Sequence, residues 1–267
     1  MASDTLDLGT PFLRFEREGH LAWCTIDRPD SRNALTSGMY YGLKKAVEIV
    51  NGFPEQTALI ITGTGDVFAP GGEMRGKMPD TNPVVAQLGW MDIIPFEAVR
   101  NSTAPIVAAV NGICQGGGLL LSVLADVTIA SERATFRSPE LLRGVADSAC
   151  AAYIAPHVGL ANARDLLFTG RTLDAREAQA MGLIARVVPH DELRERAIEA
   201  AEAMLRTAPE ARTQIKRMIN ERYGRLDLMT MDRSLYHGPE AREGFLAFTE
   251  KRAPAWVPKA LDRGKRL

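Results

Sequence analysis

One acidic side chain of this sequence, Glu140, follows Pro139 and precedes two leucines in the segment SPELLRG. A carboxylate between apolar neighbours is partly removed from water, and this loss of solvation raises its pKa. A carboxyl group with a raised pKa is suited to take up and return a proton near neutral pH. The segment therefore predicts an acid–base residue at Glu140, although a glutamate in such a position can also simply begin a helix.

Two glycine-rich turns, FAPGGEM at residues 68–74 and NGICQGGG at residues 111–118, each follow an apolar run. Glycine allows the backbone to approach a ligand closely and to turn its N–H groups inward. The second turn leads into a predicted helix, whose first N–H groups lie at the positive end of the helix dipole. Two such N–H groups directed at one oxygen form an oxyanion hole. The alternative is two tight turns that let helices pack on strands.

Strands and helices alternate in the first part of the sequence, which indicates an α/β fold with a mostly parallel sheet. A hairpin is expected for Phe12–Glu16 and Leu21–Ile26, and Thr36 or Ser37 caps a helix that follows it. The apolar positions of that helix are Met39 or Tyr40, Leu43, Val47 and Val50. Three buried strands are expected at Ala58–Thr62, Pro105–Val110 and Asp126–Ala130, with a glycine-rich loop over Gly63–Gly76, a helix over Pro83–Arg100 and a helix from Leu119.

The second half of the sequence is predominantly helical, apart from a strand predicted at Ile184–Val188. The last helices are broken at Pro209 and at Gly238–Pro239, because proline cannot continue a helix. We therefore divide the chain into a core at 1–190 and a helical C-terminal region at 191–267. The apolar stripe of this region must be buried on its own core or on a neighbouring subunit.

Composition excludes several classes of function. The formal net charge of −1 offers no basic surplus for nucleic acid. The four histidines lie far apart, without the spacing of metal ligands, so no metal site is expected. The GxGxxG motif of dinucleotide binding and the GxSxG motif of serine hydrolases are both absent.

The cysteines and the chain's apolar stretches bear on its location. Cys24, Cys114 and Cys150 are widely spaced, which is typical of a reducing compartment. The first residues are acidic and lack the apolar core of a signal peptide. No apolar stretch is long enough to span a membrane. A cytoplasmic protein without membrane insertion is expected.

The chain resembles the crotonase superfamily, the enoyl-CoA hydratase/isomerase family, over nearly its whole length. Seven segments in a fixed order carry the resemblance: RPDSRNAL, LIITGTGDVFAPGGEM, PIVAAVNGICQGGGLLL, ADVTIASERATF, SPELLRGV, LLFTGRTLDAREAQAMGLIARVV and EGFLAFTEKRAPAW. The resemblance implies a spiral core of ββα units with a helical C-terminal trimerisation region. It also implies a homotrimer or a dimer of trimers, and an acyl-CoA thioester substrate, so that CoA is part of the substrate and no separate cofactor is needed.

The resemblance also implies roles for individual residues. The thioester oxygen is expected between the N–H groups of Gly72 and Gly117, with Glu140 as the acid–base. The acyl-CoA-binding residues are expected to be Ser31, Arg32 and Ala34 on the nucleotide side, Pro70, Glu73 and Met74 at the adenine end, and Gly116, Leu120 and Pro139 nearby. Phe248 and Lys251 match residues that approach the ligand of a neighbouring subunit, and the alternatives are core packing and a solvated charge.

The sequence departs from the family's hydratases at Leu120. Those hydratases carry two glutamates that share the added water, and one of them follows the triple glycine by two residues. Here that position is Leu120, which can neither hold a water nor transfer a proton. A single carboxylate can still move a double bond, because one base can take a proton from one carbon and return it to another.

A second departure is Asp147, which lies after Gly144 where hydratases usually have an apolar or small residue. It is either a second acid that forms a dyad with Glu140 or the N-cap of the following helix. The leading interpretation is a single-carboxylate isomerase or a related enzyme on an unsaturated acyl-CoA. The alternatives are a 2-enoyl-CoA hydratase despite Leu120, and a non-catalytic acyl-CoA-binding subunit.

Overall fold

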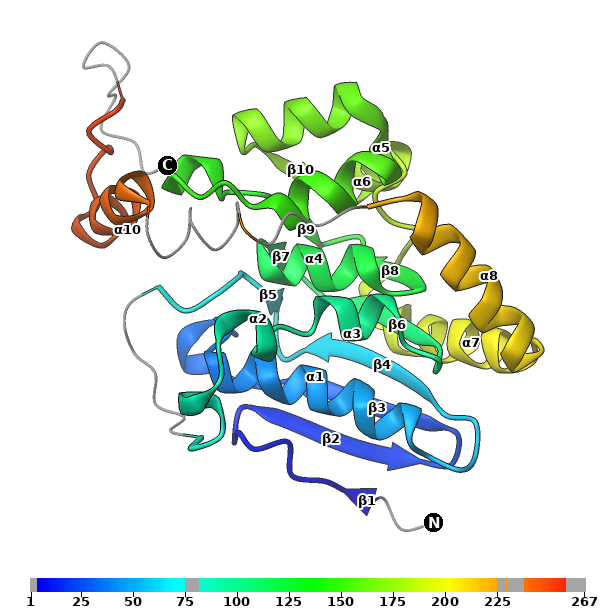
Figure 1. Ribbon diagram of the computed structural model, residues 1–267. Coiled ribbons are helices and arrows are strands. Elements are labelled where there is room, and N and C mark those ends of the chain that lie inside the picture. The colour runs from blue at the N-terminus through cyan, green and yellow to red at the C-terminus, as the bar shows by residue number, and fades with distance from the viewer. Residues whose placement is uncertain (1–3, 75–81, 225–228, 230–237, 258–267) are drawn as a thin grey trace.

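The computed structural model describes residues 4–74, 82–224, 229 and 238–257. Two sheets form the centre of an α/β fold (Figure 1). The larger sheet has the order β1 (Asp4–Thr5), β2 (Leu13–Glu18), β3 (Leu21–Ile26), β4 (Ala58–Gly63), β6 (Ile106–Val110), β8 (Val127–Ser131) and β11 (Arg186–Val188). The smaller sheet has the order β10 (Thr172–Asp174), β9 (Thr135–Arg137), β7 (Ile113–Gln115) and β5 (Val67–Ala69).

A ββα unit repeats along the chain. A strand of the larger sheet is followed each time by a short strand of the smaller sheet and then by helix, in β4–β5, β6–β7 and β8–β9. Within each sheet these strands pair in parallel. The helices after them are α2 (Trp90–Ile93) and α3 (Phe96–Arg100), then α4 (Gly117–Leu124), then α5 (Ser148–Thr169). The predicted spiral of ββα units is therefore confirmed.

Helices cover both faces of the larger sheet, so its central strands are apolar on both sides. The side chains on one face of β3, β4 and β6 belong to the main core, together with those of α1 (Ser37–Asn51) and α4. The alternate set packs against α7 (Leu193–Leu205), through Trp23, Ile60 and Val107 among others. The chain also forms α6 (Ala175–Ala180) and the 3-10 turns η1 (Pro29–Ser31), η2 (Val85–Gln87), η3 (Leu141–Arg143) and η4 (His190–Glu192).

The helix predicted from the cap at Thr36 or Ser37 and from the spacing of apolar residues is confirmed as α1. The Thr36 hydroxyl accepts a hydrogen bond from the Met39 N–H at 3.1 Å, which makes Thr36 the N-cap. All the apolar positions predicted for this helix are buried.

Two predicted elements were wrong in detail. The loop expected over Gly63–Gly76 contains strand β5, which is too short to be recognised from its own residues, and Gly76 lies outside the described residues. The helix expected over Pro83–Arg100 is divided into η2, α2 and α3. Ile94 is extended, with a ψ angle of 138°, because the ring of Pro95 disfavours helical geometry in the residue before it.

The C-terminal helices occupy two ends of the molecule. α7 covers the larger sheet and α8 (Pro209–Arg222) lies beside it, whereas α10 (Pro239–Glu250) lies at the opposite end and packs on η3 (Figure 1). The domain boundary at residue 190 stays a prediction. Among the residues described, no helix is long and apolar enough to cross a membrane.

Candidate active site

A cavity of about 420 Å³ lies at the N-terminal end of α4. Both glycine turns and Glu140 line it, so the structure brings the predicted chemical elements together. Its lining consists of Ser37, Tyr40, Pro70, Gly71, Gly72, Glu73, Met74, Trp90, Phe96, Gly116, Gly117, Leu120, Glu140, Arg143, Val145, Asp147 and Phe245.

The first turn directs one N–H group to the cavity side. The Leu35 N–H donates to the Gly71 carbonyl at 2.9 Å, and the Glu73 N–H donates to the Leu35 carbonyl at 2.8 Å. In a parallel bridge only alternate residues bond to the partner segment. The N–H of Gly72, between them, therefore faces away from Leu35. Gly71 has a φ angle of +99°, which favours glycine.

The second turn supplies the other N–H group. Gly117 is the first residue of α4, so its N–H has no acceptor within the helix and lies at the positive end of the dipole. The two turns adjoin, since a methyl group added at Gly71 would lie 3.8 Å from the Gly117 nitrogen. The role of these two N–H groups as an oxyanion hole stays a prediction.

Glu140 lies directly against the second turn. A methyl group added at Gly116 would lie 2.6 Å from Glu140 Oε1, and Gly116 also has a φ angle of +53°. The Ser138 hydroxyl donates a hydrogen bond of 2.7 Å to Glu140 Oε2. The Ser138 hydrogen bond thus orients the carboxylate beside the second glycine turn.

The surroundings of Glu140 favour its protonated form. Burial, and next the negative charge of Asp147, raise the pKa of Glu140 to about 7, although the Ser138 hydrogen bond opposes the shift. A pKa near 7 lets one group act as base and then as acid at neutral pH.

Asp147 fits both of its predicted interpretations. Its Oδ1 accepts hydrogen bonds from the N–H groups of Ala149 at 2.8 Å and Cys150 at 3.0 Å, which makes it the N-cap of α5. It also lines the cavity, and its carboxylate lies within 4.8 Å of that of Glu140. Burial raises the pKa of Asp147, against the effect of its two N–H donors. A catalytic role for Asp147 stays a prediction.

Glu140, Asp147 and Cys150 also form the group of described residues whose ligand atoms lie close enough to surround a metal ion. Burial raises the pKa of the Cys150 thiol well above its usual range. A thiol must lose its proton to bind a metal well, so this environment is unfavourable for a thiolate ligand. The absence of a metal and of a separate cofactor stays a prediction.

Apolar side chains form part of the cavity wall. Leu120, at the position of the missing carboxylate, is 1% exposed and lies one helical turn after Gly117. Phe96 and Val145 also line the cavity. An apolar side chain such as Leu120 provides no hydrogen-bond partner for a water molecule.

Helix α10 packs close to the cavity, and two glycines permit the approach. A methyl group added at Gly244 would lie 2.2 Å from the Arg143 carbonyl oxygen, and one at Gly144 would lie 2.5 Å from the Glu240 carbonyl carbon. The backbones of α10 and of the loop after η3 therefore touch. This contact lets Phe245 reach the cavity from the C-terminal region.

Three predicted substrate-binding residues line a second cavity, of about 490 Å³, between η3 and α10. These are Pro139, Phe248 and Lys251. Arg143 lines both cavities, and its guanidinium carbon lies 5.1 Å from the centre of the Phe248 ring. The roles of these residues toward a ligand stay predictions.

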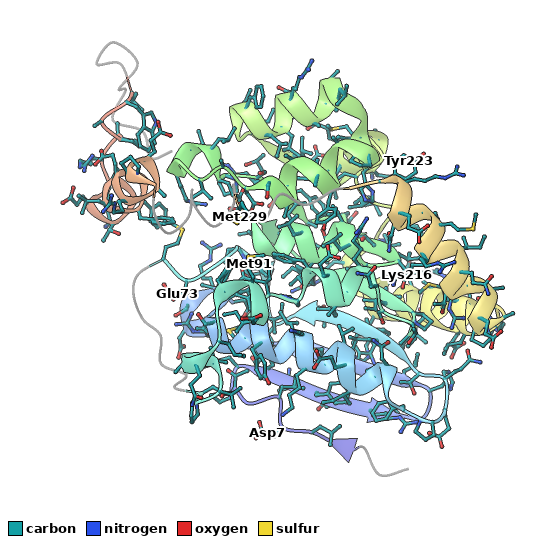
Figure 2. All side chains as sticks on the ribbon, viewed as in Figure 1. Asp7, Glu73, Met91, Lys216, Tyr223 and Met229 are labelled. Carbon is teal, nitrogen blue, oxygen red and sulfur yellow. The ribbon has the colours of Figure 1, made fainter. Side chains whose placement is uncertain are left out.

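Ser31, Arg32 and Ala34 lie in the loop before α1 and are outside the lining of both cavities. A buried ion pair ties this loop to the first glycine turn, because Arg28 Nη1 donates to Glu73 Oε2 at 2.8 Å and to the Ala34 carbonyl at 2.8 Å. Figure 2 labels Glu73 on the segment that follows β5. The side chains of Arg28 and Glu73 are 5% and 3% exposed. The expected contacts with the nucleotide stay predictions.

Several cavity residues could not be identified from the sequence. Tyr40 looks like an apolar position of α1, and Trp90 and Phe96 look like parts of one helix. Arg143 and Phe245 carry no motif of their own. These residues all line one cavity, because segments that are distant in the sequence come into contact in the fold.

Comparisons with known proteins agree with this geometry. A family model described as enoyl-CoA hydratase/isomerase matches residues 16–259. A probable mitochondrial enoyl-CoA hydratase of Dictyostelium discoideum is 32% identical, with 91% of this chain and 90% of the relative covered. A crystal structure of an enoyl-CoA hydratase/isomerase from Pseudoalteromonas atlantica has a TM-score of 0.79 and 30% identity, covering 92% of this chain and 100% of that one.

A monofunctional enoyl-CoA isomerase from M. smegmatis has a TM-score of 0.68 and 27% identity, covering 83% of this chain and 98% of that one. The family match extends over residues 16–259, which include both glycine turns and Glu140. These relatives also match most of the chain. The chain therefore belongs to the enoyl-CoA hydratase/isomerase family of the crotonase superfamily, and it is an enzyme of this acyl-CoA family.

Proposed function

We propose that the enzyme moves the double bond of an unsaturated acyl-CoA, with Glu140 as the residue that takes and returns the proton. The observation that carries this proposal is the pairing of Glu140, beside the N–H groups of Gly72 and Gly117, with the buried apolar side chain of Leu120. The cavity thus has a base at Glu140 and a leucine where the hydratases of the family carry their second catalytic glutamate.

The proposed reaction converts a 3-enoyl-CoA into a 2-enoyl-CoA. The Glu140 carboxylate takes a proton from C2, and the electron pair moves onto the thioester oxygen to form a dienolate. The N–H groups of Gly72 and Gly117 stabilise this negative charge. Protonated Glu140 then gives its proton to C4, and the double bond ends between C2 and C3. The apolar wall keeps water away from the dienolate.

A second candidate function is hydration of a 2-enoyl-CoA with Asp147 as the partner of Glu140. The observation that favours it is the position of Asp147 in the same cavity, within 4.8 Å of Glu140. Against it, Asp147 Oδ1 is already engaged by two backbone N–H groups.

Absorbance of the conjugated thioester distinguishes these functions. With 3-hexenoyl-CoA, an isomerase produces a conjugated thioester and the absorbance rises. With crotonyl-CoA, a hydratase consumes one and the absorbance falls. We expect turnover of 3-hexenoyl-CoA to be faster than turnover of crotonyl-CoA. Faster turnover of crotonyl-CoA would overturn the isomerase assignment. Binding of both thioesters without turnover of either would indicate the non-catalytic subunit.

Replacement of Leu120 by glutamate is expected to add hydratase activity toward crotonyl-CoA. A carboxylate there can hold and activate the added water, and one such acid–base group contributes on the order of 10²-fold in rate. Leu120→Gln is the matched control, because glutamine has nearly the same shape as glutamate and cannot ionise. A folded Leu120→Glu variant without any gain would mean that the cavity admits no water at this position.

The pH dependence should report Glu140 directly. As a base Glu140 must be ionised, so kcat/KM for the 3-enoyl-CoA is expected to rise with pH and to level off above about 7. Asp147→Asn keeps an N-cap but removes the neighbouring charge, so the rise should move to lower pH. A profile that is flat across this range would contradict the assigned base.

We also propose a homotrimer or a dimer of trimers. Large apolar side chains remain exposed on α5 and α8, namely Leu160, Phe168, Ile215, Met218 and Ile219. Size-exclusion chromatography with light scattering tests this, and a monomer would overturn it. The cytoplasmic location, which was inferred from the sequence, stays a prediction.

A further inference from the structure

The Tyr40 side chain of α1 lies beside the two glycines whose N–H groups form the proposed oxyanion hole. A methyl group added at Gly117 would lie 2.1 Å from the Tyr40 hydroxyl oxygen, and one added at Gly72 would lie 3.7 Å from it. The same hydroxyl therefore adjoins both glycines. The ring comes from a separate element, and it lines the cavity together with them.

The position of the Tyr40 ring is fixed by its neighbours. The ring meets Trp90 edge to face, with 5.0 Å between ring centres, and meets Phe96 at 6.1 Å in the same manner. Tyr40 is only 3% exposed, and its backbone belongs to the capped first turn of α1. A group held in this way loses little freedom when a ligand binds, which is the condition for effective stabilisation of a developing charge.

We infer that the Tyr40 hydroxyl is a third hydrogen-bond donor to the thioester oxygen, beside the N–H groups of Gly72 and Gly117. A phenol O–H is a donor that suits an oxygen gaining negative charge. The hydroxyl transfers no proton in this role: the proton still moves only between Glu140 and the two carbons. The inference rests on the proposed function, since it requires a thioester in the cavity.

A third donor also suits the movement of charge in the proposed reaction. Glu140 lies directly against the second glycine turn. As the Glu140 carboxylate takes the proton from C2, it becomes neutral and the negative charge passes to the thioester oxygen. A neutral donor carried by α1 stabilises the charge on that oxygen without adding a proton to the reaction.

Tyr40→Phe tests the inference, because it removes the hydroxyl and keeps the ring between Trp90 and Phe96. We expect kcat for the 3-enoyl-CoA to fall by about 10-fold to 100-fold, which is the range for a hydrogen bond to a charged group. KM should change little, because the oxygen is neutral in the bound substrate. Tyr41→Phe makes the same chemical change one residue later, outside the cavity lining, and should keep the wild-type kcat.

The carbonyl stretch of a bound thioester gives a second measurement that does not depend on turnover. Difference infrared spectra of cinnamoyl-CoA with a ¹³C-labelled carbonyl should show a lower frequency in the wild-type enzyme than in water. In Tyr40→Phe the frequency should move back up, and in Tyr41→Phe it should stay at the wild-type value.

The possible outcomes separate the inference from the proposed function. If Tyr40→Phe keeps the wild-type carbonyl frequency, Tyr40 is not a donor to the thioester, whatever happens to kcat. If the wild-type enzyme binds no acyl-CoA thioester, the proposed function and this inference fail together. If the wild-type enzyme hydrates crotonyl-CoA rather than isomerising a 3-enoyl-CoA, the isomerase proposal fails and the spectrum still decides the role of Tyr40.

Discussion

Glu140→Gln is expected to lower kcat by about 10²–10⁴-fold, the contribution of a positioned acid–base group, while binding of acyl-CoA is retained. Glutamine has nearly the same shape and can still accept the Ser138 hydrogen bond, but it cannot take a proton. The measurement is kcat on the 3-enoyl-CoA together with the Kd of a saturated acyl-CoA. Retention of wild-type turnover would remove Glu140 from the mechanism.

The same variant should differ from wild type in stability, with a sign that depends on pH. The pKa of Glu140 is raised to about 7 from 4.5. The associated stabilisation is therefore fully present below about 4.5 and is lost as the pH rises through about 7. Glu140→Gln has no such loss. Its Tm relative to wild type should increase from pH 5 to pH 8, which shows that the lost activity does not come from unfolding.

Gly117→Ala has the second largest expected effect, a fall in kcat of about 10²–10³-fold, as for the loss of an oxyanion donor. The added methyl group would lie 2.1 Å from the Tyr40 hydroxyl oxygen. Tyr40 cannot retreat, because Trp90 and Phe96 hold its ring. The start of α4 must therefore shift, and the Gly117 N–H leaves its position.

Gly52→Ala is the control for this prediction. Gly52 ends α1 with a φ angle of −87°, and an added methyl group there would meet no atom closer than 3.5 Å. This variant should keep the wild-type kcat and Tm. A Gly117→Ala enzyme that is as active as the control would show that the Gly117 N–H does not stabilise the reaction.

A double-mutant cycle links Gly117 to Tyr40. In the Tyr40→Phe background, the nearest atom to the added methyl group is the ring carbon Cζ, at 3.0 Å, instead of the hydroxyl oxygen at 2.1 Å. Gly117→Ala should therefore cost less in kcat there than in the wild-type enzyme. Effects that simply add would mean that the two residues do not share the site.

Much of the fold could be predicted from local signals. The Thr36 cap, the buried strands β4, β6 and β8 and the break at Pro209 each depend on a few neighbouring residues, and so they can be recognised in sequence. The strands β5, β7 and β9 could not be predicted, because each has three residues and exists only through pairing with the others. The helix expected over Pro83–Arg100 was wrong in length, because Pro95 disfavours helical geometry at Ile94 and so separates α2 from α3.

The sequence by itself determined the family and the residue types of the candidate site. The order of its motifs identified the family, and the pair of Glu140 and Leu120 indicated a base without its usual partner. Side-chain identity at motif positions is a property of the sequence, and so these conclusions needed no coordinates.

Only the tertiary structure decided which further residues surround that chemistry. Asp147 reaches Glu140 because the chain turns at η3, and Phe245 reaches the cavity because two glycines let backbones touch. Tyr40 adjoins Gly117 because α1 and the start of α4 line the same cavity. Each of these contacts joins separate elements. Their distances depend on how the whole core packs, which residue types and local spacing do not specify.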